Sequence, residues 1–258
     1  MADRTVVITG ASRGLGAAAA QILGEGSGVN VVLNARSKGD LEEVARRIDP
    51  EGRRVLVAAG DAGHKADCRD LVRRTIEHFG EIDALINNAG MLHPIAAIAE
   101  ADPQQWAANV TVNLLGPFYL THFALPYLRH RHGRVINVSS GAAVSATHGW
   151  SAYCAAKAAL NHFTRVLAAE EPDIVALAFR PGVVDTEMQR TIREEGAQGM
   201  PAESHRKFQQ YYERGELLSP EVPGRALATL ALRAPHEWSG DFVGWNEERV
   251  QALVLQHE

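Results

Sequence analysis

The residues TVVITGASRGLG at positions 5–16 decide the fold, because an apolar run is followed at once by spaced glycines and then by an alanine-rich helical pattern at 17–23. Gly10 permits a tight turn directly after the run. Gly14 lets the main chain approach a ligand, and Gly16 lets the helix pack closely on the strand. The free N–H groups at the start of such a helix bind phosphate. The stretch is typical of a dinucleotide-binding loop, and an ordinary glycine-rich turn is the alternative.

Outward from this stretch, short β-branched runs alternate with longer amphipathic segments along the chain. The runs are apolar on both faces, as expected of parallel strands that helices cover on each side. The predicted strands lie at 5–9, 29–34, 54–59, 83–87, 134–139, 173–179 and 241–245. The predicted helices lie at 15–23, 41–48, 66–79, 104–128, 152–169 and 223–232. This order predicts an α/β fold, a Rossmann-type doubly wound parallel sheet of about seven strands with helices on both faces.

We expect a single domain over residues 1–258, because no internal repeat, low-complexity tract or linker interrupts the alternation. Residues 181–222 form a strand-free insertion between the last two predicted strands, with two short helical segments inside it. The insertion leaves from the carboxyl end of a strand, where open α/β sheets bind ligands. We therefore expect it to be a lid over a substrate, and a surface excursion without that role is the alternative.

The end of the second predicted strand indicates which dinucleotide binds. An NAD-specific site usually has an Asp or Glu there, which binds the ribose hydroxyls. This chain reads Asn34-Ala35-Arg36-Ser37 instead. Arg36 and Arg13 can both pair with a 2′-phosphate, and Ser12 can add a hydroxyl, so the charges favour NADP over NAD. Asp61 follows the third strand, where the adenine would lie, and a simple turn or cap residue is the alternative there.

Composition excludes several other classes of function. The chain of 258 residues has a net charge of −5, so it has no basic surplus for nucleic acid or for an anionic membrane. Its 2 cysteines and 11 histidines make no zinc or other metal spacing. No apolar run is long enough for a signal peptide or a membrane span. We therefore expect a cytoplasmic protein without a metal site, a nucleic-acid partner or a membrane partner.

Further motifs carry a family resemblance over essentially the whole chain. They are Asn87-Asn88-Ala89-Gly90, Asn113, Ser139-Ser140, Tyr153-Cys154-Ala155-Ala156-Lys157 and Pro181-Gly182-Val183-Val184-Asp185-Thr186. In order and spacing these motifs resemble the signature set of the short-chain dehydrogenase/reductase family. The resemblance implies an oxidoreductase that acts on a C=O or CH–OH pair and assembles as a homodimer or homotetramer. It implies cofactor contacts from Gly10, Ser12, Arg13, Gly14, Leu15, Gly16, Arg36, Asp61, Asn88, Ala89, Gly90, Tyr153, Lys157, Pro181, Gly182, Val184 and Thr186.

Tyr153 and Lys157 are four residues apart at the start of a predicted helix, so they share one face. An ammonium beside a phenol favours the phenolate, and we expect Lys157 to lower the pKa of Tyr153 from about 10 towards neutrality. Tyr153 would then exchange a proton with a carbonyl oxygen or an alcohol. The resemblance adds that Lys157 binds the ribose of the nicotinamide. For an isolated YxxxK pattern, an incidental surface pair would be the alternative.

Ser140 is predicted to polarise the substrate carbonyl. It follows the fifth predicted strand and lies 13 residues before Tyr153, the separation typical of the family. Its hydroxyl would hold the developing oxyanion. Ser139 is the competitor for this role, and turn formation is the alternative for either serine.

Asn113 completes the predicted catalytic set. Pro117 lies four residues later and has no N–H, so the carbonyl of Asn113 loses its helical partner. In the family, the matching asparagine holds a water that extends the proton relay to the lysine. The alternative is a kink at Gly116-Pro117 that only shapes packing.

The insertion and one neighbouring loop indicate the substrate. Their apolar and aromatic side chains would wall a pocket for a bulky or aromatic carbonyl, and they are Trp150, Met188, Phe208, Tyr211 and Tyr212. Stretches at 159–163, 180–186 and 239–243 are similar to sepiapterin reductase-like and benzil reductase-like carbonyl reductases. That resemblance implies NADPH-dependent reduction of an aromatic or bulky ketone or vicinal diketone, with Tyr153 as proton donor. The alternatives are a 3-oxoacyl or steroid-type reductase and a non-catalytic NADP(H) sensor.

Overall fold

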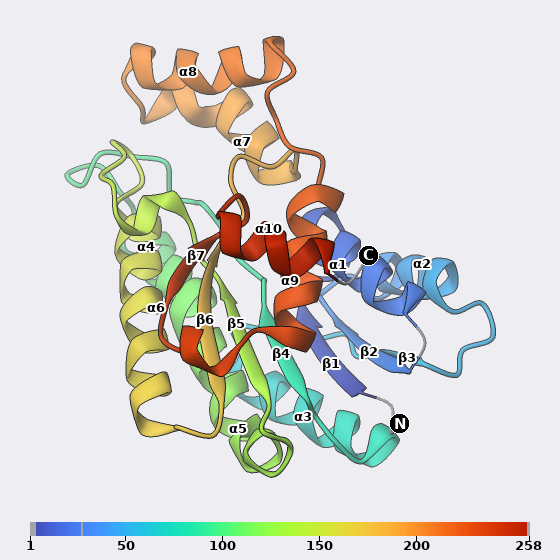
Figure 1. The fold of residues 1–258 in the computed structure, drawn as a ribbon. Helices are drawn as coiled ribbons and strands as arrows, with labels where there is room; N and C mark the ends of the chain where they lie inside the picture. Colours follow the sequence, from blue (N-terminus) through green and yellow to red (C-terminus); the bar gives the residue numbers. More distant parts are fainter. Residues whose placement is uncertain (1–3, 27, 257–258) are drawn as a thin grey trace.

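Parallel strands form one sheet in the computed structural model, which describes residues 4–26 and 28–256 (Figure 1). The order across the sheet is β3-β2-β1-β4-β5-β6-β7. The strands are β1 (Arg4–Thr9), β2 (Val29–Asn34), β3 (Val55–Val57), β4 (Ala84–Asn87), β5 (Arg134–Val138), β6 (Val175–Arg180) and β7 (Phe242–Gly244). The chain runs outwards from β1 to β3, returns to the centre and then runs the other way from β4 to β7. This confirms the predicted doubly wound sheet, and a ligand crevice is expected where the order reverses, beyond β1 and β4.

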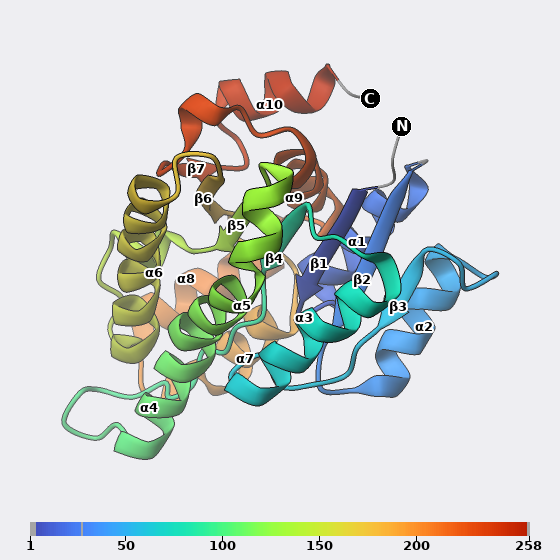
Figure 2. The ribbon, with the colours of Figure 1, turned by 90° about the horizontal axis from the view of Figure 1, so that it is seen from below.

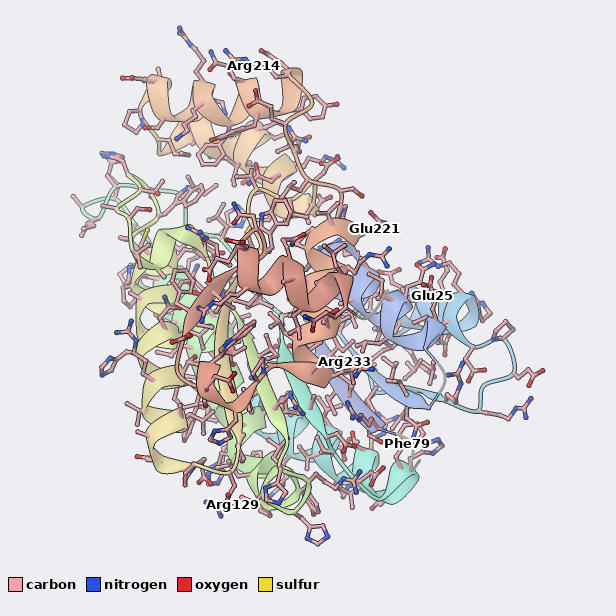
Figure 3. All side chains as sticks on the ribbon, in the orientation of Figure 1. Glu25, Phe79, Arg129, Arg214, Glu221 and Arg233 are labelled. Atoms are coloured by element: carbon pink, nitrogen blue, oxygen red, sulfur yellow. The ribbon has the colours of Figure 1, made fainter. Side chains whose placement is uncertain are left out.

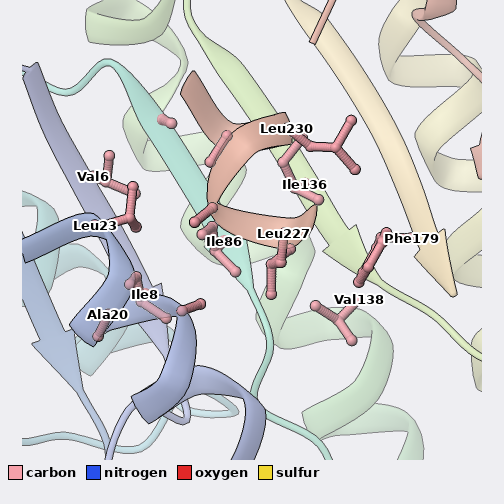
Figure 4. Packing of buried hydrophobic residues seen from close by; sticks show 14 of the residues in the cluster. Val6, Ile8, Ala20, Leu23, Ile86, Ile136, Val138, Phe179, Leu227 and Leu230 are labelled. Atoms are coloured by element: carbon pink, nitrogen blue, oxygen red, sulfur yellow. The ribbon is translucent and has the colours of Figure 1, made fainter. Parts of the chain in front are cut away.

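Helices cover both faces of this sheet (Figures 1 and 2). They are α1 (Gly14–Glu25), α2 (Lys38–Ile48), α3 (Lys65–Phe79), α4 (Pro103–Val110), α5 (Gly116–Arg131), α6 (Ser151–Glu170), α7 (Glu187–Glu195), α8 (Ala202–Glu213), α9 (Glu221–Arg233) and α10 (Glu248–Leu255). Val6 and Ile8 of β1 belong to the core shared with α1, α2, α9 and α10, whereas Val7 belongs to the core shared with α3, α5 and α6. Figure 4 shows Leu227 of α9 beside Ile86 of β4 in the first of these cores. Side chains that point alternately to the two faces therefore build two cores.

Two helices differ from the sequence-based prediction. The helix predicted at 104–128 contains a π-helical turn at Thr111–Leu115, between α4 and α5, in which the N–H of Gly116 donates to the carbonyl of Thr111. Pro117 lacks the N–H that an α-helical turn would need here, so the predicted helix defect is confirmed. The pattern does not predict α10, because a helix of only 8 residues gives a weak periodic signal.

Residues 181–222, called the insertion below, follow the carboxyl end of β6 and stand beyond the sheet (Figure 1). The insertion contains α7 and α8, joined through a 3₁₀ turn at Gly196–Gln198. A parallel bridge between Val184 and Leu218 joins its two ends, so it is not wholly strand-free. Figure 3 shows Arg214, next to α8, at the opposite end of the molecule from Phe79 and Arg129, which lie near the amino ends of the strands. The insertion thus lies at the ligand-binding end of the sheet.

Candidate active site

The turn after β1 leaves room for a bare main chain only. Gly10 has a positive φ of +65°, and a Cβ atom on it would lie 2.9 Å from Nδ2 of Asn88. A Cβ atom on Gly16 would lie 2.3 Å from the carbonyl oxygen of Gly10. Among the described residues, α1 has no acidic residue in its first turn, and Arg13 gives it no side-chain cap. Its N–H groups and the glycine cradle fit a pyrophosphate, as the sequence predicts.

Thr9 joins this loop to the segment after β4. Its Oγ1 accepts hydrogen bonds of 3.0 Å from the main-chain N–H groups of Asn88 and Ala89. In return, Nδ2 of Asn88 donates to the carbonyl of Thr9 at 2.9 Å. The two loops at the switch point are thereby held together, with Gly90 exposed beside them. Thr9 has no predicted role among the sequence motifs, although its place directly before Gly10 is a usable signal.

Asn34 occupies the place where an NAD-specific site carries a carboxylate. Its side chain is turned to the protein instead, because Nδ2 donates to the carbonyls of Ala58 at 2.9 Å and Gly60 at 3.3 Å. Arg13 and Arg36 are both exposed at this edge of the sheet. The amide of Asn34 thus joins β2 to the loop after β3. The solvent-exposed charges near this place, those of Arg13 and Arg36, are positive.

Asp61 forms a local turn. Its Oδ1 accepts a 2.8 Å hydrogen bond from the N–H of Gly63, and its own N–H donates to Oδ2 of Asp67 at 2.8 Å. The structure therefore shows the turn, and an adenine contact by Asp61 stays a prediction. Ser12 is half-buried in the glycine loop, and Leu15 is buried in α1.

Tyr153 and Lys157 lie one turn apart on α6, with exposed fractions of 7% and 3%. Nζ of Lys157 lies 5.7 Å from the ring centre of Tyr153. Burial raises the pKa of Tyr153 to about 12, and a hydrogen bond with Ser140 opposes this rise in part. Burial lowers the pKa of Lys157 to about 7. The expected lowering of the Tyr153 pKa is therefore wrong in this structure, because burial of the phenol raises its pKa by more than the hydrogen bond with Ser140 lowers it.

The two serines after β5 have different partners. Ser139 is buried, and its Oγ donates to Oδ1 of Asn161 at 2.6 Å. Ser140 is half-buried, and its Oγ accepts a 3.1 Å hydrogen bond from the N–H of Ala142 while also contacting the phenol of Tyr153. The structure thus brings Ser140, and not Ser139, to Tyr153, in agreement with the choice made from the spacing.

Asn113 lies in the π-helical turn and is fully buried. Its Nδ2 donates at 2.8 Å both to the carbonyl of Met91 and to Oδ1 of Asn109, and its Oδ1 accepts from the N–H of Met91 at 3.3 Å. Asn109 is also buried, and its Nδ2 donates to the carbonyls of Met91, Leu92 and His93 at 2.8 to 3.1 Å. The two amides fix the segment after β4, and the sequence analysis missed Asn109, one helical turn before Asn113.

Gly90 brings the predicted cofactor and proton-transfer residues together. A Cβ atom on Gly90 would lie 2.9 Å from Oδ1 of Asn113 and 3.8 Å from Nζ of Lys157. Only a glycine leaves this approach open, since a side chain here would separate the segment after β4 from α6.

An apolar cluster surrounds Tyr153. Its members, called the site cluster below, are Leu92, Ile95, Ala142, Trp150, Tyr153, Ile192 and Met200, with Met188, Cys154 and Phe208 packed against them. The ring centre of Trp150 lies 5.3 Å from that of Phe208 and 6.0 Å from that of Tyr153. Tyr212, which the sequence analysis placed in the pocket wall, is 56% exposed and lies under the guanidinium of Arg193. That expectation is wrong because Tyr212 points outwards from α8.

The insertion contacts the segment after β4 at two points. Nε2 of His93 lies 2.8 Å from Oε2 of Glu195. A Cβ atom on Gly199 would lie 2.1 Å from the carbonyl oxygen of Ile95, so the main chains approach closely there. The insertion therefore packs against the segment after β4, and it contributes Ile192 and Met200 to the site cluster.

The base of the insertion reaches the glycine loop. A Cβ atom on Gly14 would lie 3.1 Å from Cγ2 of Thr186, the residue directly before α7. Val184 is buried, and Gly182 has a φ of +81°. Together with Pro181, these residues lie between β6 and α7, so the structure brings this predicted cofactor segment to the loop after β1.

Two negative findings apply to residues 4–26 and 28–256. No helix in these ranges combines the length and the apolar character that crossing a membrane requires. Likewise, these ranges contain no group of three or more His, Cys, Asp or Glu side chains arranged to hold a metal ion.

A glycine loop at the switch point of a doubly wound sheet, together with a buried tyrosine and lysine and a half-buried serine, is typical of nicotinamide-dependent oxidoreductases. The chain belongs to the short chain dehydrogenase family, which matches residues 4–197. A benzil reductase ((S)-benzoin forming) from Saccharomyces cerevisiae is 35% identical over 258 aligned residues, which cover 96% of this chain and 97% of that protein. The crystal structure of the KRED1-Pglu enzyme is 42% identical, has a TM-score of 0.89 and covers 93% of this chain and 100% of its own. A variant of actinorhodin polyketide ketoreductase, solved with NADPH, is 25% identical, has a TM-score of 0.84 and covers 95% of this chain and 97% of its own.

Proposed function

We propose that the chain is an NADPH-dependent carbonyl reductase that transfers hydride to an aromatic or bulky ketone or vicinal diketone. The position of Tyr153 carries the proposal, because its phenol is buried in the site cluster, in contact with Ser140 and one turn from Lys157. A phenol whose pKa is raised stays protonated near neutral pH. It is therefore a proton donor, which reduction of a carbonyl needs.

We infer that the cofactor is NADPH. When bound, it supplies the hydride. Gly10, Gly14 and Gly16 would hold its pyrophosphate at the start of α1. Arg13 and Arg36 would pair with the 2′-phosphate, and among the described residues neither forms a salt bridge with a carboxylate. The NADPH in the actinorhodin ketoreductase structure supports the same choice.

Four side chains would act on the substrate carbonyl and the proton. Ser140 hydrogen-bonds the carbonyl oxygen and holds its developing charge, while Tyr153 donates the proton to that oxygen. Lys157 binds the ribose hydroxyls next to Tyr153. Asn113 fixes the segment after β4 through its amide, and its main-chain carbonyl in the π-helical turn would hold the water that links Lys157 to solvent.

The site cluster supports an aromatic or bulky substrate. Its side chains are almost all apolar, and the ring of Trp150 stands edge-on to the ring of Tyr153 and packs against the ring of Phe208. The benzil reductase of S. cerevisiae, similar over nearly the whole chain, favours a vicinal diketone within this class. We also infer that the insertion is a lid, since its residues Ile192, Met200 and Phe208 pack in the site cluster around Tyr153.

We infer that the chain assembles as a homodimer or homotetramer through α5 and α6. Phe118 and Tyr127 on α5 and Val166 on α6 are between 36% and 43% exposed, and the ring centre of Phe118 lies 6.2 Å from that of Phe163 on α6. Such a stripe fits a second copy of the same surface. Light scattering after size exclusion tests it, and a monomer would contradict it.

Initial rates of NADPH and NADH oxidation test the proposed function. The substrates are benzil, isatin, a pteridine ketone and an acetoacetyl thioester, and Tyr153→Phe is the control. We expect turnover of the aromatic dicarbonyls with NADPH, and its loss in the control. Preference for NADH would contradict the cofactor, and preference for the thioester would favour a 3-oxoacyl reductase. Tight NADPH binding without turnover of any carbonyl would contradict the proposed enzyme and favour a sensor.

A further inference from the structure

The indole N–H of Trp150 has no hydrogen-bond partner among the described residues, although its nitrogen is inaccessible to solvent. The residue is 6% exposed. Burying a donor without an acceptor is unfavourable, so such groups are rare in folded proteins and call for a reason. Trp106, by contrast, donates from Nε1 to Oγ of Ser151 at 3.2 Å. The indole of Trp150 therefore has an unused capacity to donate.

Trp150 lies at the point where a substrate would meet the proton donor. Its ring is tilted by 34° against the ring of Phe208 from the insertion and stands edge-on, at 88°, to the ring of Tyr153. The main chain of Trp150 fixes the residue in this place. Its main-chain N–H donates to the carbonyl of Thr147 at 3.1 Å, and the residue pairs with Ala96 in a parallel bridge. A group that enters between Phe208 and Tyr153 must therefore contact the indole.

We propose that the indole N–H of Trp150 recognises a second oxygen of the substrate, next to the carbonyl that Tyr153 protonates. This inference rests on the proposed function and narrows its substrate class to ketones with an oxygen on the adjacent carbon, above all vicinal diketones. Tyr153 and Ser140 engage the reacting oxygen, and the site cluster is otherwise apolar. The second oxygen of a diketone would lie unpaired among apolar side chains unless a donor met it, and the donor of Trp150 is free to do so.

The test must distinguish a hydrogen bond to the second oxygen from packing of Trp150 against the substrate's ring. Benzil and 1,2-diphenylethanone allow this, because the two ketones share one carbon skeleton and the second lacks the second oxygen. Trp150→Phe removes the N–H and retains an aromatic ring, and Phe208→Leu changes the facing ring without touching a donor. Since benzil is intrinsically the more reactive ketone, the informative quantity is how each variant changes the ratio of kcat/KM for benzil to kcat/KM for the monoketone.

We expect Trp150→Phe to lower this ratio about 10- to 100-fold, the value of one buried hydrogen bond, with the monoketone little affected. Phe208→Leu should lower both kcat/KM values and leave the ratio within about threefold. NADPH affinity and the melting temperature verify that each variant is folded. An unchanged ratio in Trp150→Phe would overturn the proposal and leave Trp150 a packing residue.

Measuring ketone binding without turnover tests this inference independently of the proposed function. Calorimetry measures the Kd values of both ketones for the NADP⁺ complex of the wild type and of Trp150→Phe. If benzil binds more tightly than the monoketone and Trp150→Phe removes that difference, the inference holds even where turnover is absent and the proposed reaction fails. If the wild type binds neither ketone, or binds both equally, the inference is overturned.

Discussion

Nζ of Lys157 donates a 2.7 Å hydrogen bond to the main-chain carbonyl of Val138, the last residue of β5. This bond gives the buried ammonium a neutral acceptor but no counter-charge. Burial accordingly lowers the pKa of Lys157 from its ordinary 10.5 to about 7. The lysine is held where the proposed reaction needs it, at a cost to the stability of the fold.

Lys157→Met should abolish reduction and stabilise the fold at pH 7. Between pH 7 and 10.5 the unfolded chain binds the proton of Lys157 more tightly than the folded chain does, so the free energy of unfolding rises with pH in this range. Below pH 7 the ammonium is charged in both states, and the full cost of burying it lowers the free energy of unfolding. Removing the ammonium should increase the free energy of unfolding by about 1–3 kcal/mol at pH 7, allowing for the lost bond to Val138. Urea unfolding at pH 7 and pH 9.5 should show a smaller gain at the higher pH.

Lys65→Met is the matched control for this measurement, because Lys65 is exposed at the start of α3. We expect it to change the free energy of unfolding by no more than about 0.5 kcal/mol at either pH. If Lys157→Met had a lower free energy of unfolding than the wild type at pH 7, the inferred cost of burying the ammonium would be contradicted.

The two directions of the proposed reaction should differ in their pH dependence. Because burial raises the pKa of Tyr153 to about 12, the phenol is protonated through the neutral range and reduction should not gain from higher pH. Oxidation of the alcohol needs the phenolate, whose fraction rises about tenfold per pH unit below the pKa. The kcat/KM for the alcohol with NADP⁺ should therefore climb from pH 7 to 10. A plateau above pH 8 would instead show that the ternary complex lowers the pKa of Tyr153 after all.

The fold could be predicted because the signals that fix it are local. The stretch around Gly10 joins a strand, a tight turn and a helix, and a glycine is needed there whatever lies elsewhere in the chain. The helix defect near Asn113 was also readable, since Pro117 lacks an N–H wherever it stands. The short helix α10 escaped prediction because its 8 residues give only a weak periodic signal.

Side-chain partners in the site could not be read from spacing alone. The spacing placed Lys157 near Tyr153, but the sign of the pKa shift of Tyr153 depends on how deeply the phenol is buried, which is a property of the whole site cluster. Asn109 looks like any polar helical residue until the segment after β4 folds over it and presents three carbonyls. The orientation of Tyr212 likewise depends on how α8 is rotated.

Asn113→Ala should lower turnover about tenfold and destabilise the fold by about 2 kcal/mol. Loss of the amide leaves the carbonyl of Met91 and Oδ1 of Asn109 without the hydrogen bonds that Asn113 donates to them. Asn109→Ala is the matched comparison, because it releases the same segment but leaves the amide of residue 113 in place. Steady-state kinetics and urea unfolding of both variants check this. Wild-type turnover in Asn113→Ala would show that the amide is not needed to hold the π-helical turn in the geometry that the proposed relay requires.

Arg36→Asp should reverse the cofactor preference. The carboxylate would repel a 2′-phosphate and accept hydrogen bonds from a free ribose, so kcat/KM with NADPH should fall about 10- to 100-fold while that with NADH should not fall. Arg46→Ala, in the last turn of α2 and exposed, is the control and should leave the ratio unchanged. If Arg36→Asp kept the wild-type preference, the 2′-phosphate would have to be bound elsewhere.

Gly199→Ala should keep the insertion from closing. The added Cβ atom would lie 2.1 Å from the carbonyl oxygen of Ile95, and two main chains cannot both stay in place at that distance. Because the displaced insertion carries Phe208 away from Trp150, kcat/KM for an aromatic diketone should fall about 10- to 100-fold. The Kd for NADPH should change little, since the glycine loop is untouched.

Gly39→Ala is the control, because a Cβ atom there meets nothing within 4 Å. Its kinetics should match the wild type, and the same result for Gly199→Ala would show that closure of the insertion plays no part in binding the substrate.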